Sequence, residues 1–241
     1  MKAVRAGLAI AVCGIAFGTA TAAAAPSEQG SDHANVHATL IDVEVFDAAK
    51  GGAKPPAGAN CSNDGATDAA NVAYTGWTTA GGVAHLNLAT VPASVPNATA
   101  SLQSAFNAWS NAGAPAFTVV NDGNVTRQTA NRRTDLMFGR TQGSALAVTY
   151  TWRWTDGTIE SDTIFNASFS WRDLGVEGDG CYETQPYYDL QNIATHEFGH
   201  IQGLDHPSAA RFETMYAYGY SGETLKRSPG LGDLAAIAAL Y

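Results

Sequence analysis

Three of the six histidines of this 241-residue chain fall within the eleven-residue segment HEFGHIQGLDH, residues 196–206. Side chains four residues apart lie on one face of an α-helix, with about 5–6 Å between their β-carbons, so His196 and His200 can direct ring nitrogens at one point. Gly203 can adopt the left-handed backbone conformation that ends a helix and turns the chain sharply. That turn brings His206 back toward the first two histidines. The segment therefore predicts a helix, a turn and a loop arranged around three imidazoles.

These residue types are typical of a catalytic metal site. Three histidine ligands leave the fourth position of a zinc ion open, whereas structural zinc sites fill all four positions with protein ligands. Glu197 follows His196 and is rotated from it by about 100° around the helix, so it can approach that open position and take the proton of a water that attacks a carbonyl. The pattern predicts Glu197 as the catalytic base. The three predicted zinc ligands are His196, His200 and His206.

The same segment matches the extended pattern HExxHxxGxxH of the metzincin zinc peptidases. From about residue 73 onward the chain resembles their matrixin branch. The resemblance implies a zinc ion bound by the three histidines, with Glu197 as general base. It also implies a Met-turn, which is a hydrophobic floor beneath the metal, at Met215, nine residues after His206.

A further part of the resemblance is the segment GSALAVTY, which begins at residue 143. It is similar to the edge strand that forms the upper rim of the matrixin cleft and pairs with an extended substrate backbone, a mode in which main-chain hydrogen bonds supply the affinity. The resemblance therefore implies protein or peptide substrates. The substrate-binding residues implied in this edge strand are Gly143, Ser144, Ala145 and Leu146.

Hydrophobic periodicity predicts the elements around the motif. It indicates an amphipathic helix over residues 98–113, a second helix that begins after Asp189 and ends at Gly203, and a third over residues 231–241. A hairpin turn is predicted at Asp156-Gly157. Strand patterns occupy residues 38–46, 83–92, 115–123, 134–140 and 143–171. The fold class is α+β: one zincin-like catalytic domain with a twisted mixed sheet, an active-site helix and a C-terminal helix.

Three aromatic residues within the last strand pattern, Tyr150, Trp152 and Trp154, alternate with polar residues. Alternate residues of a strand point to the same face of the sheet. We expect this aromatic face to form the sheet core rather than a platform for a ligand.

The N-terminus has the order of a secretory signal peptide, with a basic start, an apolar run over about residues 6–17 and then small residues. The apolar run is shorter than the ~20 residues that cross a bilayer. We therefore expect residues 1–25 to be removed and the mature protein to be secreted or periplasmic, without a membrane anchor. Residues 26–72 form an N-terminal arm or a pro-region, and residues 73–241 form the catalytic domain.

Removal of the signal peptide takes the net charge from −9 to −11, because Lys2 and Arg5 are lost. An anionic surface repels phosphate backbones, so nucleic acid is not expected as a partner. Two cysteines remain, and in an oxidising compartment we expect Cys61 and Cys181 to form a disulfide. The alternative is a free Cys61 thiolate held on the metal, which would keep an enzyme latent.

The residues and the resemblance together indicate a secreted zinc-dependent endopeptidase. One alternative is a secreted, zinc-stabilised binding or adhesion module without catalysis, which would have no need of Glu197. Another is a zinc hydrolase of non-peptide amides, against which the predicted edge strand argues. Calcium is common in the resembled family, and Asp173, Glu177 and Asp179 form either a calcium-binding loop or a solvated loop.

Overall fold

The computed structural model describes residues 36–49, 71–173, 186–208 and 210–241. Its main element is a seven-stranded sheet with the strand order β3-β2-β4-β6-β5-β1-β9. Its strands are β1 (Ala38–Ala48), β2 (Gly82–Leu86), β3 (Phe117–Val120), β4 (Thr134–Gly139), β5 (Ala145–Trp154), β6 (Ile159–Asn166) and β9 (Tyr218–Gly219). A separate two-stranded sheet joins β7 (Trp171–Arg172) to β8 (Tyr188–Asp189). The helices are α1 (Ala98–Asn111), α2 (Leu190–Ile201) and α3 (Leu231–Leu240), with 3₁₀ turns η2 (Leu88–Thr90) and η3 (Leu225–Arg227).

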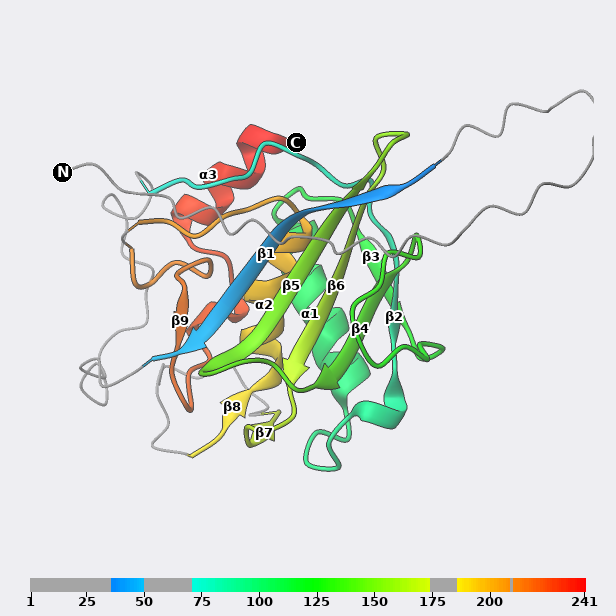
Figure 1. Cartoon of the computed structure of the whole chain (residues 1–241). Coiled ribbons are helices and arrows are strands. Elements are labelled where there is room, and N and C mark those ends of the chain that lie inside the picture. Colours follow the sequence, from blue (N-terminus) through cyan, green and yellow to red (C-terminus); the bar gives the residue numbers. More distant parts are fainter. Residues whose placement is uncertain (1–35, 50–70, 174–185, 209) are drawn as a thin grey trace, which may run out of the picture. The chain divides into compact units, whose positions relative to one another are not determined.

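The sheet is mixed and twisted, as predicted (Figure 1). Strands β3, β2, β4 and β6 run parallel to one another, whereas β5 is antiparallel to β6. The reversal follows from the predicted hairpin turn, where Gly157 has a positive φ of 88° and its N–H donates to Trp154 O at 2.9 Å. Strand β1 is antiparallel to β5 and parallel to β9.

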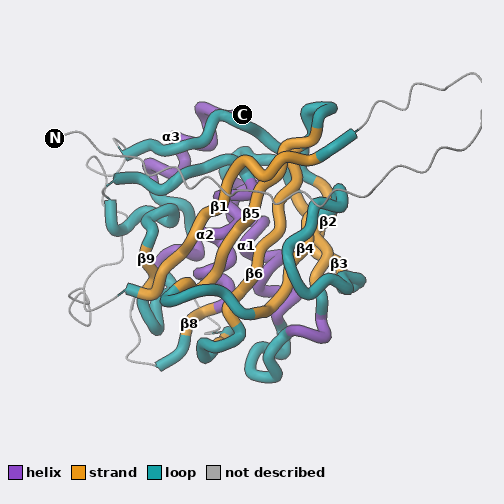
Figure 2. Tube along the Cα trace, viewed as in Figure 1, coloured by secondary structure: helices purple, strands orange, loops and turns teal. Residues whose placement is uncertain are grey.

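Helices α1 and α2 pack against one face of the sheet and against each other (Figure 2). The apolar face predicted for residues 98–113 is buried in α1, where Phe106 stacks on Phe198 of α2 with ring centroids 3.8 Å apart. Trp109 is fully buried, and its Nε1 donates to Thr195 O at 2.7 Å. These contacts join the two helices in one core and hold α2 in place beneath the sheet.

The ends of α2 confirm the predicted N-cap and turn. The Asp189 side chain accepts a hydrogen bond from Asn192 N at 2.8 Å, which satisfies an N–H group that the first turn leaves free. At the other end Gly203 has a φ of 92°, and Leu204 N donates to Gly199 O at 3.0 Å. A β-carbon at residue 203 would lie 2.3 Å from Trp77 O, so both the backbone conformation and the packing require glycine there.

The prediction that the aromatic stripe of β5 forms the sheet core holds for Trp152 but not for Tyr150 and Trp154. Trp152 is buried, but Tyr150 and Trp154 are only half-buried, and none of the three belongs to the main core cluster. The opposite face of β5 meets α2, where Thr149 contacts Glu197. Strand alternation then places the aromatic rings on the outer face, where Trp154 is covered by the Arg132 guanidinium at 4.3 Å.

The segment predicted as the rim of the cleft does not form a free edge. Ala145 and Leu146 begin β5, and Gly143 and Ser144 directly precede it. Strand β1, from the N-terminal arm, pairs along β5 from Ala38↔Trp154 to Asp47↔Ala145. The Ser144 carbonyl also accepts a hydrogen bond from Ala48 N at 2.8 Å, so part of the main chain that the resemblance assigns to a substrate already pairs within the chain.

Several predictions concern residues outside those that the structure describes. They are the signal peptide over residues 1–25, the pairing of Cys61 with Cys181, and the acidic groups of Glu177 and Asp179. These remain predictions. Among the described residues, no helix has the length and apolar content needed to cross a membrane.

Candidate active site

The three predicted histidines converge. His196 Nε2 lies 3.0 Å from His206 Nε2 and 3.1 Å from His200 Nε2. The first two histidines are fully buried on α2, and His206 comes from the loop that follows the Gly203 turn. The three side chains can therefore offer their ring nitrogens to one metal ion, which is the arrangement that the spacing predicts.

The outer nitrogens of the imidazoles determine their tautomers. His196 Nδ1 lies 2.7 Å from Thr214 O, and His200 Nδ1 lies 2.9 Å from Leu204 O. A carbonyl oxygen can only accept, so each Nδ1 must carry the hydrogen. In a neutral ring the Nε2 atom then presents a lone pair, and two such lone pairs point into the same space.

Burial keeps these rings neutral. It lowers the pKa of His196 and His200 well below the ordinary value, and the charges of the neighbouring histidines lower both further. Burial also lowers the pKa of His206 to about 4, although the carboxylates of Asp205 and Asp47 oppose the shift. Neutral imidazole is the form that binds a metal.

The residues fit a zinc ion. Lone pairs about 3 Å apart repel each other unless a cation lies between them. Tetrahedral zinc with Zn–N bonds of about 2.0–2.1 Å separates its ligand nitrogens by about 3.3 Å, which is close to the 3.0 Å and 3.1 Å found here. Imidazole is also a preferred zinc ligand.

Glu197 lies next to His196 and is fully buried. Its Oε2 accepts a hydrogen bond from Thr149 Oγ1 at 2.5 Å, while its Oε1 has no hydrogen-bond partner among the described residues. Burial raises the pKa of Glu197 to about 8, against the effect of the Thr149 hydrogen bond and with a contribution from the negative charge of Glu44. A cation held by the histidines would favour the ionised carboxylate.

Met215 packs against the active-site helix α2. It is 1% exposed, and its sulfur packs so closely on α2 that a β-carbon at Gly199 would lie 2.2 Å from it. The preceding residue, Thr214, supplies the carbonyl that orients His196. Asp233 of α3 accepts from Thr214 N at 2.7 Å and from Met215 N at 3.3 Å. The segment predicted as a Met-turn therefore supports a histidine and connects the site to the C-terminal helix.

Three residues at the site were not found by sequence reasoning. Thr149 reaches Glu197 from β5, Phe46 of β1 stacks on His196 with ring centroids 3.8 Å apart, and Glu44 Oε2 lies 3.4 Å from His206 Nδ1. Thr149 lies in the segment GSALAVTY, but that resemblance concerns substrate pairing and says nothing of Glu197. Phe46 and Glu44 lie in the strand pattern of residues 38–46, which does not say where that strand pairs.

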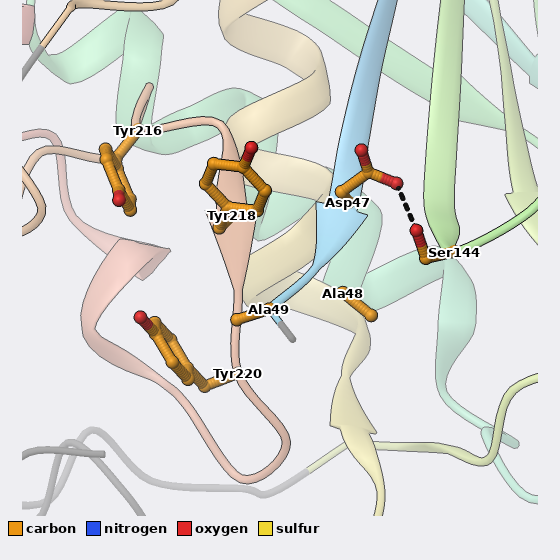
Figure 3. Close-up of a pocket in the computed structure, with 7 residues that line it drawn as sticks. All are labelled: Asp47, Ala48, Ala49, Ser144, Tyr216, Tyr218 and Tyr220. Carbon is orange, nitrogen blue, oxygen red and sulfur yellow. Dashed lines mark hydrogen bonds between the residues drawn. The ribbon is translucent and has the colours of Figure 1, made fainter. Parts of the chain in front are cut away.

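A cavity of about 370 Å³ lies at the end of β1, between the start of β5 and β9. Figure 3 shows Asp47 turned toward Ser144, whose Oγ donates to Asp47 Oδ1 at 2.9 Å. Three tyrosines form the opposite side. The lining residues are Asp47, Ala48, Ala49, Ser144, Tyr216, Tyr218 and Tyr220.

A mixed sheet, a helix with the motif HExxH and a third histidine after a glycine turn define the metzincin class of zinc peptidases. Within that class, the family model for matrixin matches residues 85–241, which is more than half of the chain. The chain therefore belongs to the matrixin family, whose members are zinc metallopeptidases. A comparison with curated proteins finds no match.

Proposed function

We propose that this protein is an exported zinc endopeptidase that cuts peptide bonds in extended protein segments, with Glu197 as general base. The observation that carries the proposal is the pairing of three converging neutral imidazoles with a buried carboxylate on the same helix. A purely structural metal site gains nothing from burying an adjacent carboxylate, because burial penalises its charge.

The residues of the site have two roles, metal binding and proton transfer. His196, His200 and His206 would hold the metal, and zinc supplies Lewis acidity toward a peptide carbonyl and toward water when it is bound. Glu197 takes the proton of the attacking water and then gives it to the leaving amine. The Thr149 hydroxyl holds Oε2 of that carboxylate, which leaves Oε1 as the oxygen available to the proton.

The Thr149 hydroxyl is itself held in position. Its Oγ1 lies 2.9 Å from Thr163 Oγ1 of β6. A hydroxyl donates only one hydrogen, so when Thr149 donates to Glu197 the remaining bond is donated by Thr163. The two threonines thus form a short chain of hydrogen bonds that fixes the carboxylate from the sheet.

The main test compares zinc content and hydrolysis in variants of the full chain. Glu197→Ala is expected to retain zinc, measured by atomic absorption after dialysis, and to lose cleavage of a complex peptide library. His206→Ala is expected to lose zinc, whereas His85→Ala, a histidine outside the site, keeps it. Full activity in Glu197→Ala would remove this residue from its role. Unchanged zinc in His206→Ala would contradict the proposed ligand set.

A further inference from the structure

A second cavity, of about 250 Å³, lies at one end of the main sheet. Strands β3, β2, β4 and β6 run parallel, so they all begin at the end of the sheet where a turn joins β5 to β6 (Figure 1). The first residues of three of these strands, Phe117, Thr134 and Ile159, contribute to the cavity wall. Among the described residues that line the cavity, none belongs to the candidate active site.

Two consecutive arginines, Arg132 and Arg133, line this cavity, in a chain whose net charge is −9. Of the described lining residues, Glu160 is the acidic one, and both of its oxygens already accept hydrogen bonds. Oε1 accepts from Asn131 N at 2.7 Å. Oε2 accepts from Arg132 N at 2.6 Å and from Trp154 Nε1 at 2.7 Å. Two guanidinium groups thus face one carboxylate, and the cavity is locally positive.

The protein holds the segment that carries these arginines in an unusual conformation. Arg132 has a positive φ of 66°, which is uncommon for a residue other than glycine. The bonds from Asn131 N and Arg132 N to the buried Glu160 carboxylate maintain it. The Arg132 guanidinium lies 4.3 Å from the centre of the Trp154 ring and 2.8 Å from Asp156 Oδ2. Strained backbone that the surrounding structure maintains is typical of segments that clamp a ligand.

The Arg133 guanidinium has donors that no group in the described structure accepts. Its Nε and Nη2 atoms are buried and make no hydrogen bond with any described residue. Oxygens of Asp135 and Asp122 lie 3.6 Å from them, which is too long for a hydrogen bond, and neither residue lines the cavity. Buried donors without an acceptor are rare in folded proteins. These two donors therefore indicate that the cavity receives an acceptor group.

We propose that this cavity is a binding site for an oxyanion, which Arg132 and Arg133 recognise. Guanidinium groups bind carboxylate, phosphate and sulfate oxygens through charge-assisted hydrogen bonds. Hydroxyl groups can turn their hydrogens toward such oxygens, and the cavity is also lined by Thr79, Thr134 and Thr158. Its volume of about 250 Å³ is several times the ~30 Å³ that one water occupies in the liquid. The cavity therefore has room for a free phosphate ion or for the end of an acidic side chain.

The main test measures binding of inorganic phosphate to the zinc-loaded full-length chain by isothermal titration calorimetry. Two charge-assisted hydrogen bonds correspond to a Kd on the order of 1 mM. Arg133→Gln removes the unpartnered donors, so we expect phosphate to bind at least about tenfold more weakly. Arg153→Gln, at an exposed position of β5 outside the cavity, is the matched control and should bind phosphate as wild type does.

A second variant protects the test against a folding defect. Arg132→Gln changes a side chain that is 42% exposed, and circular dichroism establishes which variants are folded. Weaker binding in both arginine variants, with unchanged binding in Arg153→Gln, would support the site. Equal binding in wild type and in the folded Arg132→Gln and Arg133→Gln chains would overturn the inference, because the phosphate would then be bound elsewhere, for example at the zinc.

Competition experiments distinguish the two sources of the oxyanion. The α-amide of N-acetylglutamic acid presents a side-chain carboxylate, and sulfate is a free tetrahedral anion. Displacement of phosphate by the glutamate derivative would assign the site to acidic side chains of a protein partner. Displacement by sulfate alone would assign it to a free anion. Displacement by sodium chloride as effective as that by either competitor, at equal ionic strength, would show only charge screening and would refute a specific site.

Discussion

Replacement of Gly199 by alanine tests the contact between the active-site helix and the residues beneath it. Gly199 lies inside α2, directly before His200. A β-carbon there would lie 2.2 Å from Met215 Sδ and 2.8 Å from Trp109 Cζ2. Neither neighbour is free to move, because Met215 is 1% exposed and Trp109 Nε1 is bonded to Thr195 O at 2.7 Å.

The magnitude follows from two opposing effects. Alanine gains about 1 kcal/mol over glycine inside a helix, whereas overpacking of a rigid core costs about 1–3 kcal/mol. Contacts of 2.2 Å and 2.8 Å to two held side chains place the cost in the upper part of that range. We expect a net loss of about 1–2 kcal/mol, which lowers the Tm of a domain of this size by about 2–8 °C.

Thermal unfolding of Gly199→Ala against wild type measures the effect. Ser104→Ala, at an exposed position of α1, is the control for helix propensity and is expected to be slightly stabilising. The double variant Gly199→Ala/Met215→Ala has no sulfur atom near residue 199. Its loss of stability should therefore be smaller than the sum of the losses in the two single variants. A Gly199→Ala chain as stable as wild type would show that Met215 and Trp109 do not confine α2 as described.

Two further predictions concern buried polar groups. Thr149→Val removes the hydroxyl that holds Glu197, so we expect kcat to fall about tenfold with unchanged zinc content; an unchanged kcat would exclude a positioning role. Burial raises the pKa of Asp233 above its ordinary value of 3.8, and the Glu213 carboxylate raises it further. The protonated Asp233 side chain therefore stabilises the fold at low pH. This stabilisation is lost as the pH rises through the pKa of the folded state. The free energy of unfolding is measured at about pH 6 and at about pH 9. Between these two values it should fall less in Asp233→Asn than in wild type or in the exposed control Asp156→Asn. Equal decreases in all three proteins would contradict a raised pKa at Asp233.

The elements that sequence reasoning predicted correctly depend on neighbours in the chain. Local interactions within a few residues produce the apolar spacing of α1, the Asp189 cap and the Gly203 turn. Such patterns can therefore be recognised from the sequence alone. The convergence of His196 and His200 is also local, because helix geometry sets their separation. For the same reason the matrixin motif identified the family correctly.

The failures concern partners distant in sequence. The aromatic stripe of β5 has the alternation of a half-buried strand, but alternation does not say which face meets the helices. The Thr149–Glu197 hydrogen bond joins residues 48 positions apart, and no spacing rule connects them. The strand pattern of residues 38–46 was recognised, yet its pairing with β5 was not.

The spacing of histidines, a glutamate and a glycine within one short segment is enough to predict a zinc ligand set, because helix pitch and one left-handed residue bring the three imidazoles to one place. Which groups surround that set is a different matter. The carbonyl of Thr214 that orients His196, the hydroxyl on Glu197 and the strand β1 that pairs with β5 come from other segments. Their positions follow from packing of the sheet on α1 and α2, a property of the folded chain as a whole.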